Sequence, residues 1–352
     1  MKGWIKLVLL LYLFVLAIEI IKTTSLSLAP DIGGFLVNGT SPVRALATGW
    51  FTTAVVQSSG AIGSVTAALV GNEILNLEIA VFILMGAALG TTVTALLISI
   101  ITISQKRRDF RHGFEIGLAY SLYIAMVVVI VFFLELFFGV FSKASFFLAS
   151  TIGNSIPLGK AVNILDIATG PIVDALMENV GGILAFIFGI AVLIFVLRYV
   201  SKVVVDVLGG EEKARNFINK HFNSKIKIYF IGVLLTAITF SSSITISLLV
   251  PLAVGRLINL KKAIPFILGA ASGTSTDIFL ASIVIGNANA LATFIAFFLF
   301  SVTGAIIFLP NTKFIHRITK YTSKKLIHIS RRKALYFLFG FILIPLLIIL
   351  IF

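Results

Sequence analysis

The stretch QSSGAIG at Gln57–Gly63 decides the fold, because the sequence around it occurs a second time in the chain. Residues 53–100 align without a gap on residues 236–283 at a constant offset of 183, and 17 of these 48 positions are identical. The second copy of the stretch reads FSSSITI at Phe240–Ile246. The repeated residues are small or hydroxylated and stand in otherwise apolar sequence, which is typical of membrane proteins built from internal repeats.

Composition places the chain among polytopic membrane proteins. It is 59% hydrophobic and 12% charged, with a mean hydropathy of +1.11, and a soluble chain of 352 residues would carry far more charge. It has no cysteine, which excludes disulfides, thiolate metal sites and cysteine nucleophiles. Apolar runs of about 18 residues are long enough to cross a ~30 Å hydrocarbon core as helices. Such runs predict crossings at 4–21, 77–104, 114–141, 181–207, 262–285, 288–309 and 335–352.

The net charge of +14 is concentrated in two segments. One is the loop at 106–111, and the other is 311–334, which holds eight Lys or Arg residues and no acidic residue. The positive-inside rule places both segments in the cytoplasm and the linker 142–180 outside. A nucleic-acid partner is the rival explanation, but anionic lipid headgroups explain the charge more simply. We therefore expect contacts with membrane lipids and no nucleic-acid partner.

The charged loops also orient the two copies. Helix 77–104 ends at a basic loop and therefore runs inward, whereas its counterpart 262–285 begins beside basic residues and therefore runs outward. Copies that cross the membrane in opposite directions form an inverted-topology repeat. The expected fold is an all-α polytopic membrane protein with two such repeats. Its expected units are a first repeat at 1–141, an outer linker at 142–180, a second repeat at 181–310 with an amphipathic segment at 211–228, a basic cytoplasmic loop at 311–334 and a last crossing at 335–352.

The Ser-rich segments 42–72 and 229–255 are predicted to be re-entrant helical hairpins. With a cytoplasmic N-terminus, which Lys2 and Lys6 support, the chain must lie outside both before and after 42–72. The same reasoning puts both ends of 229–255 inside. Backbone that breaks a helix at membrane depth is tolerated only against protein or a watery cavity. The two broken tips are therefore predicted to meet near the midplane and form a binding site.

The predicted tips, 57–60 and 241–245, carry an amide and several hydroxyls but no Lys or Arg. Where a helix opens, its free N–H groups and its dipole favour an anion, while hydroxyl and carbonyl oxygens suit a hard cation such as sodium. The rival explanation is that small residues only let helices pack closely. Both explanations stay open for Gly86, Gly90, Gly269 and Gly273.

Each copy carries a QSSSATT-like motif and, further on, a GANIGTT-like motif. The first copy reads QSSGAIG and then GAALGTT at Gly86–Thr92, and the second reads FSSSITI and then GAASGTS at Gly269–Ser275. Two such motif pairs in register resemble the type II sodium/phosphate cotransporter family. The resemblance spans both repeats and implies a secondary transporter that moves inorganic phosphate together with sodium.

Matching the motifs residue by residue gives the site that the resemblance implies. The implied substrate-binding residues are Gln57, Ser58, Ser59, Ser241, Ser242 and Ser243. The implied cation-binding residues are Thr91, Thr92, Thr274 and Ser275. The chain departs from the family pattern with Gly60 for a Ser, Phe240 for a Gln, and Ala88 and Ala271 for two Asn residues. Each departure removes polar capacity, so the substrate and the cation stoichiometry stay open.

Asp277 is a polar gain, since the first copy has Thr94 at the matching position. A carboxylate at bilayer depth costs about 2.5–3.5 kcal/mol on insertion scales, and a sodium ion or a proton would compensate for it. We expect Asp277 to bind or couple the driving cation, with Thr245 among the further hydroxyl ligands. The alternative is a carboxylate that is solvated in a polar cavity or paired with a basic residue. Glu135 also stands in an apolar run, and its role stays open.

Two other classes of function compete with a coupled carrier. An intramembrane serine enzyme would need a base near the serines, but the histidines fall in basic loops or on the amphipathic segment, so no enzyme activity is expected. These histidines are His112, His221, His316 and His328. A channel, a carrier of another solute and a proton-driven carrier would each use the same site. We expect a protein of the cell membrane with no cofactor beyond the transported sodium, and its oligomeric state stays open.

Overall fold

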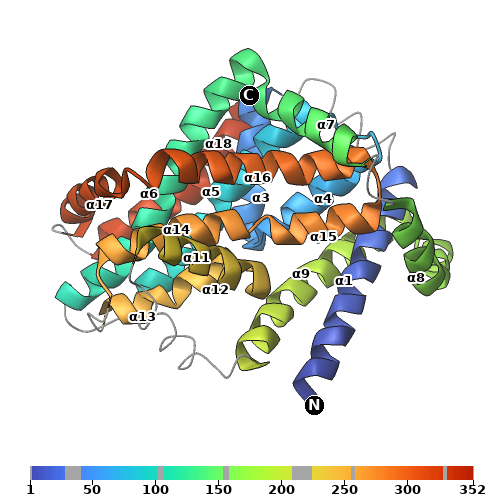
Figure 1. The fold of residues 1–352 in the computed structure, drawn as a ribbon, viewed down its shortest axis with the longest axis horizontal. Helices are drawn as coiled ribbons and strands as arrows, with labels where there is room; N and C mark the ends of the chain where they lie inside the picture. The colour runs from blue at the N-terminus through green and yellow to red at the C-terminus, as the bar shows by residue number, and fades with distance from the viewer. Residues whose placement is uncertain are drawn as a thin grey trace.

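Helices form all the regular secondary structure in the part of the chain that the structure describes (Figure 1). This computed structural model describes residues 2–27, 41–101, 107–153, 158–207, 224–254, 258–327 and 331–351. The all-α prediction is confirmed within these ranges, and most of the expected amphipathic segment 211–228 lies outside them. The helices are α1 (Lys2–Ser27), α3 (Pro42–Val56), α4 (Ser59–Gly71), α5 (Leu77–Ile101), α6 (Arg107–Phe138), α7 (Val140–Gly153), α8 (Leu158–Val180), α9 (Gly182–Val207), α11 (Lys225–Thr239), α12 (Ser242–Ser247), α13 (Leu249–Val254), α14 (Leu260–Gly273), α15 (Thr276–Ile285), α16 (Ala288–Phe308), α17 (Thr312–Ile327) and α18 (Arg331–Ile351).

Four helical stretches within the described residues are long and apolar enough to cross a membrane. They are Leu77–Leu97, Arg111–Phe138, Leu260–Ile285 and Ala288–Phe308. The crossings predicted near both termini and at 181–207 coincide with α1, α18 and α9, whose apolar stretches are shorter. The stretch in α5 is 89% buried and that in α6 only 39%, so α5 is central and α6 peripheral. Exposed aromatic side chains on α6, such as Phe133 and Phe137, suit a helix that faces lipid.

Two pairs of helices touch backbone to backbone, α3 with α5 and α11 with α14. A Cβ on Gly86 would overlap the carbonyl of Leu46, and a Cβ on Gly269 would overlap the carbonyl of Tyr229. At the same offset of 183, Leu46 corresponds to Tyr229 and Gly86 corresponds to Gly269. The next glycine of the motif makes a second close contact in each copy. The glycines of these contacts are Gly86, Gly90, Gly269 and Gly273, so the helix-packing explanation holds for all four.

The second copy contains a helix break that the sequence analysis missed. The stretch 262–285 was predicted to be one helix, but α14 ends at Gly273 and α15 begins at Thr276. The hydroxyls of Thr274, Ser275 and Thr276 each donate to a backbone carbonyl three or four residues earlier, at 2.9–3.1 Å. Three successive hydroxyls of this kind compete with the helical hydrogen-bond ladder and bend it. Asp277 consequently lies in the first turn of α15 rather than inside a continuous helix.

The predicted outer linker 142–180 is helical over most of its length, as α7 and α8. Glu135 explains how α7 begins, because its carboxylate accepts hydrogen bonds from the N–H groups of Phe141 at 2.7 Å and Ser142 at 3.2 Å. A tight turn at Gly139, with φ of 60°, brings α7 back toward α6. Glu135, whose role in an apolar run the sequence left open, therefore caps the N-terminus of α7.

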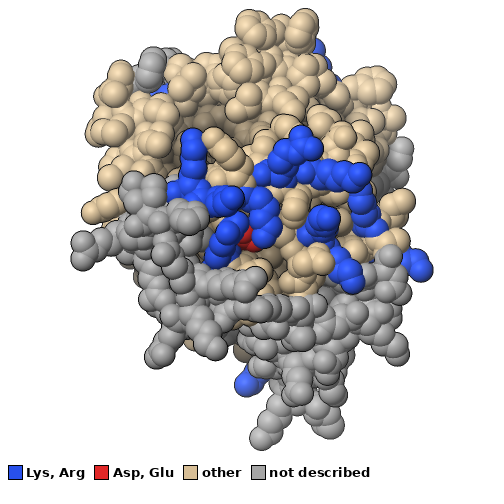
Figure 2. Space-filling model, turned by 90° about the vertical axis from the view of Figure 1, so that its left-hand side faces the viewer, with Lys and Arg blue, Asp and Glu red and all other residues tan. Residues whose placement is uncertain are grey.

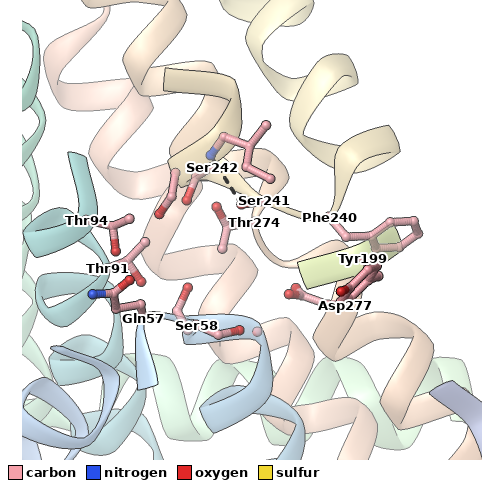
Figure 3. Close-up of a pocket in the computed structure, with 14 residues that line it drawn as sticks. Gln57, Ser58, Thr91, Thr94, Tyr199, Phe240, Ser241, Ser242, Thr274 and Asp277 are labelled. Carbon is pink, nitrogen blue, oxygen red and sulfur yellow. Dashed lines mark hydrogen bonds between the residues drawn. The ribbon is translucent and has the colours of Figure 1, made fainter. Parts of the chain in front are cut away.

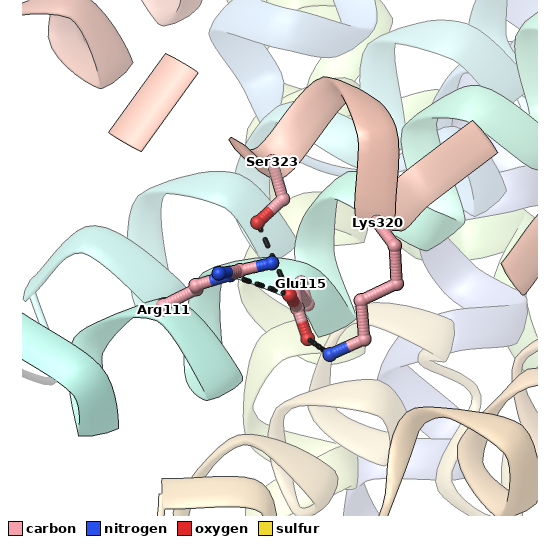
Figure 4. Close-up of polar contacts among 4 residues, drawn as sticks. All are labelled: Arg111, Glu115, Lys320 and Ser323. Carbon is pink, nitrogen blue, oxygen red and sulfur yellow. Dashed lines mark hydrogen bonds and ion pairs between the residues drawn. The ribbon is translucent and has the colours of Figure 1, made fainter. Parts of the chain in front are cut away.

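The basic segment 311–334, predicted to be a loop, contains helix α17 and the start of α18. Glu115, whose side chain is 1% exposed, holds α17 against α6 (Figure 4). Its carboxylate pairs with Lys320 Nζ at 2.6 Å and with Arg111 Nε at 2.9 Å, and it accepts a hydrogen bond from Ser323 at 3.1 Å. The carboxylate of Glu115 therefore joins the start of α6 to α17.

We expect Glu115→Gln to lower the stability of the folded protein by about 1–3 kcal/mol, the usual cost of leaving a buried polar network incomplete. Lys320 and Arg111 are 38% and 30% exposed, so water will solvate part of what they lose. Thermal unfolding in detergent measures the effect, and Glu178→Gln on the exposed face of α8 is the matched control. Equal melting temperatures for the two variants would contradict a tie between α6 and α17.

Candidate functional site

Two helix breaks with the same geometry lie at the Ser-rich motifs. Gln57 follows α3 with φ of 59° and ψ of 31°, and Phe240 follows α11 with φ of 54° and ψ of 24°. Both residues are left-handed, a conformation that costs a residue with a side chain of order 1–2 kcal/mol. The next residues, Ser58 and Ser241, are extended and begin α4 and α12. The two copies therefore break at equivalent positions, at a cost that neighbouring structure must compensate.

The two breaks line one cavity of about 350 Å³ (Figure 3). Helices α5, α9 and α15 and the turn between α14 and α15 supply the rest of its wall. Figure 3 shows Gln57, Thr91 and Thr94 together on one side, with Asp277 and Tyr199 on the other. The lining residues are Gln57, Ser58, Ser59, Gly60, Thr91, Thr94, Tyr199, Phe240, Ser241, Ser242, Ser243, Ile244, Thr274 and Asp277.

The cavity brings together most of the residues singled out from the sequence. All six expected substrate-binding residues line it, as do Thr91, Thr274 and Asp277 from the expected cation set. Thr92, Thr245 and Ser275 are buried but do not line it. Their hydroxyls bond backbone carbonyls of their own or the preceding helical turn, at 2.8–3.0 Å. This placement defines the groups within reach of a ligand in the cavity.

The two motif serines that begin the helices keep a free hydrogen-bond donor. Ser58 Oγ accepts the N–H of Ala61 at 3.1 Å, and Ser241 Oγ accepts the N–H of Ile244 at 3.2 Å. A serine hydroxyl that accepts from its own helix still has one O–H to donate. Both hydroxyls line the cavity, so each can donate to an acceptor placed there. A third serine, Ser242, lies within 3.3 Å of the buried Tyr120 hydroxyl on α6.

The cavity threonines have the opposite capacity. Thr91 Oγ1 donates to the carbonyl of Ala87 at 3.0 Å, and Thr274 Oγ1 donates to the carbonyl of Ala270 at 3.1 Å. A hydroxyl that has given its proton to the backbone offers only lone pairs to the cavity. Oxygen lone pairs are ligands for a hard cation or acceptors for a protonated group. Serine donors and threonine acceptors thus face the same space.

Asp277 brings a carboxyl group to the wall, and Gly60 is the reason that it fits. The carboxyl of Asp277 lies so close to α4 that a Cβ on Gly60 would overlap Oδ2. The side chain is 2% exposed, and no ion pair joins it to any side chain that the structure describes. The N–H of Ile278 lies 3.3 Å from Oδ1, a long hydrogen bond within the first turn of α15.

Sequence reasoning did not place Thr94 or Tyr199 in the wall. Gly60 and Ile244 lie within the predicted tips, but Gly60 and Phe240 were treated only as lost polar positions. Thr94 could have been found, because it is the counterpart of Asp277 at the offset of 183. Tyr199 carried no signal, since it stands on α9, outside the repeated motifs.

Comparison with known proteins gives the family. The family model for Na+/Pi-cotransporters matches residues 13–156 and 192–344, which include both Ser-rich motifs. The chain belongs to the Na+/Pi-cotransporter family. It is a multi-pass membrane protein of a transporter family rather than of an enzyme family.

The relatives are distant. Sodium-dependent phosphate transport protein 2A of Rattus norvegicus is 23% identical over 418 residues, covering 95% of this chain and 65% of the relative. The protein of the same description from Mus musculus is 22% identical over 416 residues, with the same coverage. Protein 2B of Homo sapiens is 28% identical over 120 residues, 32% of this chain. The chain thus spans about two thirds of the length of the curated 2A relatives. No solved structure shows a significant match.

Proposed function

We propose that this member of the Na+/Pi-cotransporter family carries inorganic phosphate with sodium across the cell membrane, as a secondary active symporter. The observation that carries the proposal is the cavity in which both motif breaks meet, although 183 residues separate them along the chain. A site between two matching halves is what alternating access requires, because either half can then open while the other closes. The distant relatives named as sodium-dependent phosphate transport proteins support the substrate and the driving ion.

The proposal treats α3–α4 and α11–α13 as re-entrant hairpins. An arm of 15 or 13 residues is about 20 Å long, shorter than the ~30 Å hydrocarbon core. The end of α4 lies at the turn between α15 and α16, where Asn287 Nδ2 donates to the carbonyl of Gly71 at 2.8 Å. The end of α13 lies instead at the start of α6, where Val254 packs beside Gly113. These contacts lie at opposite ends of the molecule, which supports two hairpins that enter from opposite faces in an inverted repeat.

The basic end supports the orientation in the membrane. Figure 2 shows Lys and Arg side chains gathered at the end that carries α17 and the starts of α6 and α14. Burial lowers the pKa of His316 on α17, and the nearby positive charges of Lys320 and Lys261 lower it further. By the positive-inside rule this end faces the cytoplasm and its anionic lipids, and the N-terminus is assigned to the same side on the charges of Lys2 and Lys6.

Phosphate in this cavity would be held by neutral donors. The hydroxyls of Ser58 and Ser241 have O–H groups to donate, and Gln57 adds an amide that is absent from the second copy. No Lys or Arg is among the described lining residues. Neutral donors bind an oxyanion less tightly than a guanidinium clamp does, which suits a ligand that must be released on the far side. Sodium would be bound by oxygens, for which Thr274 and Asp277 are in place.

Proteoliposomes loaded with purified protein test this function. We expect an inward sodium gradient to drive labelled phosphate above its external concentration, and a potassium gradient of the same size to give no accumulation. A passive channel would give only downhill flux under both gradients. Phosphate uptake that depends on a proton gradient and not on a sodium gradient would show that protons are the driving ion. Absence of any phosphate flux in folded, reconstituted protein would overturn the substrate assignment.

A further inference from the structure

The contact between Gly60 and Asp277 joins the two copies inside the cavity. Gly60 lies in the first turn of α4 and Asp277 in the first turn of α15. A side chain on Gly60 would overlap both Oδ2 and Cγ of Asp277, so the carboxyl occupies the volume that any larger residue at position 60 would need. The present place of the carboxyl therefore depends on a glycine in the other copy.

The same two positions exist in the other half of the cavity with different residues. At the offset of 183, Gly60 corresponds to Ser243, and Thr94 corresponds to Asp277. All four residues line the cavity. One side of the cavity thus pairs the serine of the second copy with the threonine of the first, and the other side pairs the glycine of the first copy with the aspartate of the second. Position 60 has no side chain where the carboxyl of Asp277 lies, so the two residues of this pair are complementary in volume.

The exchange makes the two sides of the cavity electrically unequal. An ionised Asp277 without an ion pair needs a compensating cation, because a buried lone charge is costly. The opposite side is neutral, and Thr94 Oγ1 is buried there without a partner among the described residues. Gln57 and Thr91 lie on that neutral side, whereas Phe240 and Tyr199 lie beside Asp277 (Figure 3). A carboxylate repels an oxyanion, so anion and cation are sorted to opposite sides.

We propose that Gly60 and Asp277 form a matched pair that builds a sodium site with a fixed negative charge, while the Ser243 and Thr94 side of the cavity takes the oxyanion. The proposal rests on the sodium-coupled function above and adds where each ion binds. Thr274, three residues before Asp277, supplies a second oxygen to the sodium site, whereas Thr91, which offers only lone pairs, can accept a hydrogen bond from a protonated oxygen of the anion. Gly60 acts here as a positioning residue, since it makes room for the carboxylate and touches no ion itself.

A double-variant experiment separates the pair from its members. The variants are Gly60→Ser, Asp277→Thr and their combination, which copies the residues of the other half, with Gly340→Ser as control because nothing lies within 4 Å of a Cβ at that helical glycine. Melting temperature is measured in detergent against sodium concentration, with choline replacing sodium, and then against inorganic phosphate at saturating sodium.

We expect Asp277→Thr to raise the half-maximal sodium concentration at least about tenfold, since one unit charge is lost from the site. Its response to phosphate at saturating sodium should change little. Gly60→Ser should lower the melting temperature through the clash, and the combined variant should regain stability without regaining the sodium response. Unchanged sodium dependence in Asp277→Thr would overturn the proposal, whether or not Gly60→Ser folds. A combined variant no more stable than Gly60→Ser would overturn the matched pair.

The outcome is distinguishable from failure of the transport function. A sodium-induced rise in melting temperature that requires Asp277 supports the pair even in a protein that accumulates no phosphate. Conversely, sodium-driven phosphate uptake that Asp277→Thr leaves at its wild-type sodium dependence supports the transport function and refutes the pair.

Discussion

Replacing Ser58 and Ser241 together by alanine is expected to lower phosphate uptake at low phosphate by about 10²–10⁴-fold. A hydrogen bond to a charged group contributes about 1.5–3 kcal/mol, and each serine has one O–H to donate into the cavity after accepting from its own helix. The two sites lie in different copies, so their effects should be close to additive unless both bind one oxygen. Initial rates of labelled phosphate uptake under a fixed sodium gradient measure the loss.

Aspartate variants distinguish the loss of a donor from the loss of a helix cap. Ser58→Asp or Ser241→Asp keeps an oxygen that can cap the helix start but adds a negative charge that repels phosphate. We expect these variants to melt near the wild-type temperature and to transport at least as poorly as the alanine variants. Ser150→Ala on α7, where the hydroxyl bonds its own helix, is the control that should transport normally. Near-normal uptake by folded Ser58→Asp would show that the hydroxyls do not contact the substrate.

The positions of the helix breaks could be predicted because the sequence contains them twice. Ser58 and Ser241 are short polar residues at the start of a helix, inside segments whose length does not suit a simple crossing, and the common offset removes most of the ambiguity of a single motif. Family membership agrees with what the motifs implied. The predicted inverted arrangement places the two breaks at one cavity, so most of the lining residues could be named from the sequence.

Features that depend on contacts between distant segments could not be predicted. Glu135 looked like a buried charge in an apolar run because its partners, the first N–H groups of α7, became partners only through the turn at Gly139. Segment 311–334 looked like a loop because it is highly charged. The sequence did not show that Glu115 of α6 would pair with Lys320 and hold this segment as a helix. The break before Asp277 coincides with three hydroxyls that bond to the helix backbone. The periodicity of the sequence does not reveal this competition.

The glycines at the helix contacts were the most ambiguous residues in sequence, and they carry the second large expected effect. Gly86→Ala and Gly269→Ala should each destabilise the protein by about 3 kcal/mol or more, the upper end for overpacking, because the added Cβ meets a backbone carbonyl that cannot rotate away. The loss outweighs the ~1 kcal/mol that alanine contributes in a helix.

A control with the opposite sign makes the expected loss specific to the helix contacts. Gly340 is also helical but has nothing within 4 Å of a Cβ, so Gly340→Ala should be neutral or slightly stabilising in the same thermal unfolding assay. The matching glycines of the two copies should lose similar amounts of stability, since each touches the equivalent carbonyl, of Leu46 or Tyr229. If Gly86→Ala and Gly269→Ala melted like Gly340→Ala, the close approach of α3 to α5 and of α11 to α14 would be wrong. The breaks at Gln57 and Phe240 would then lose the support that offsets their strained backbone, and the cavity between them would have no fixed wall.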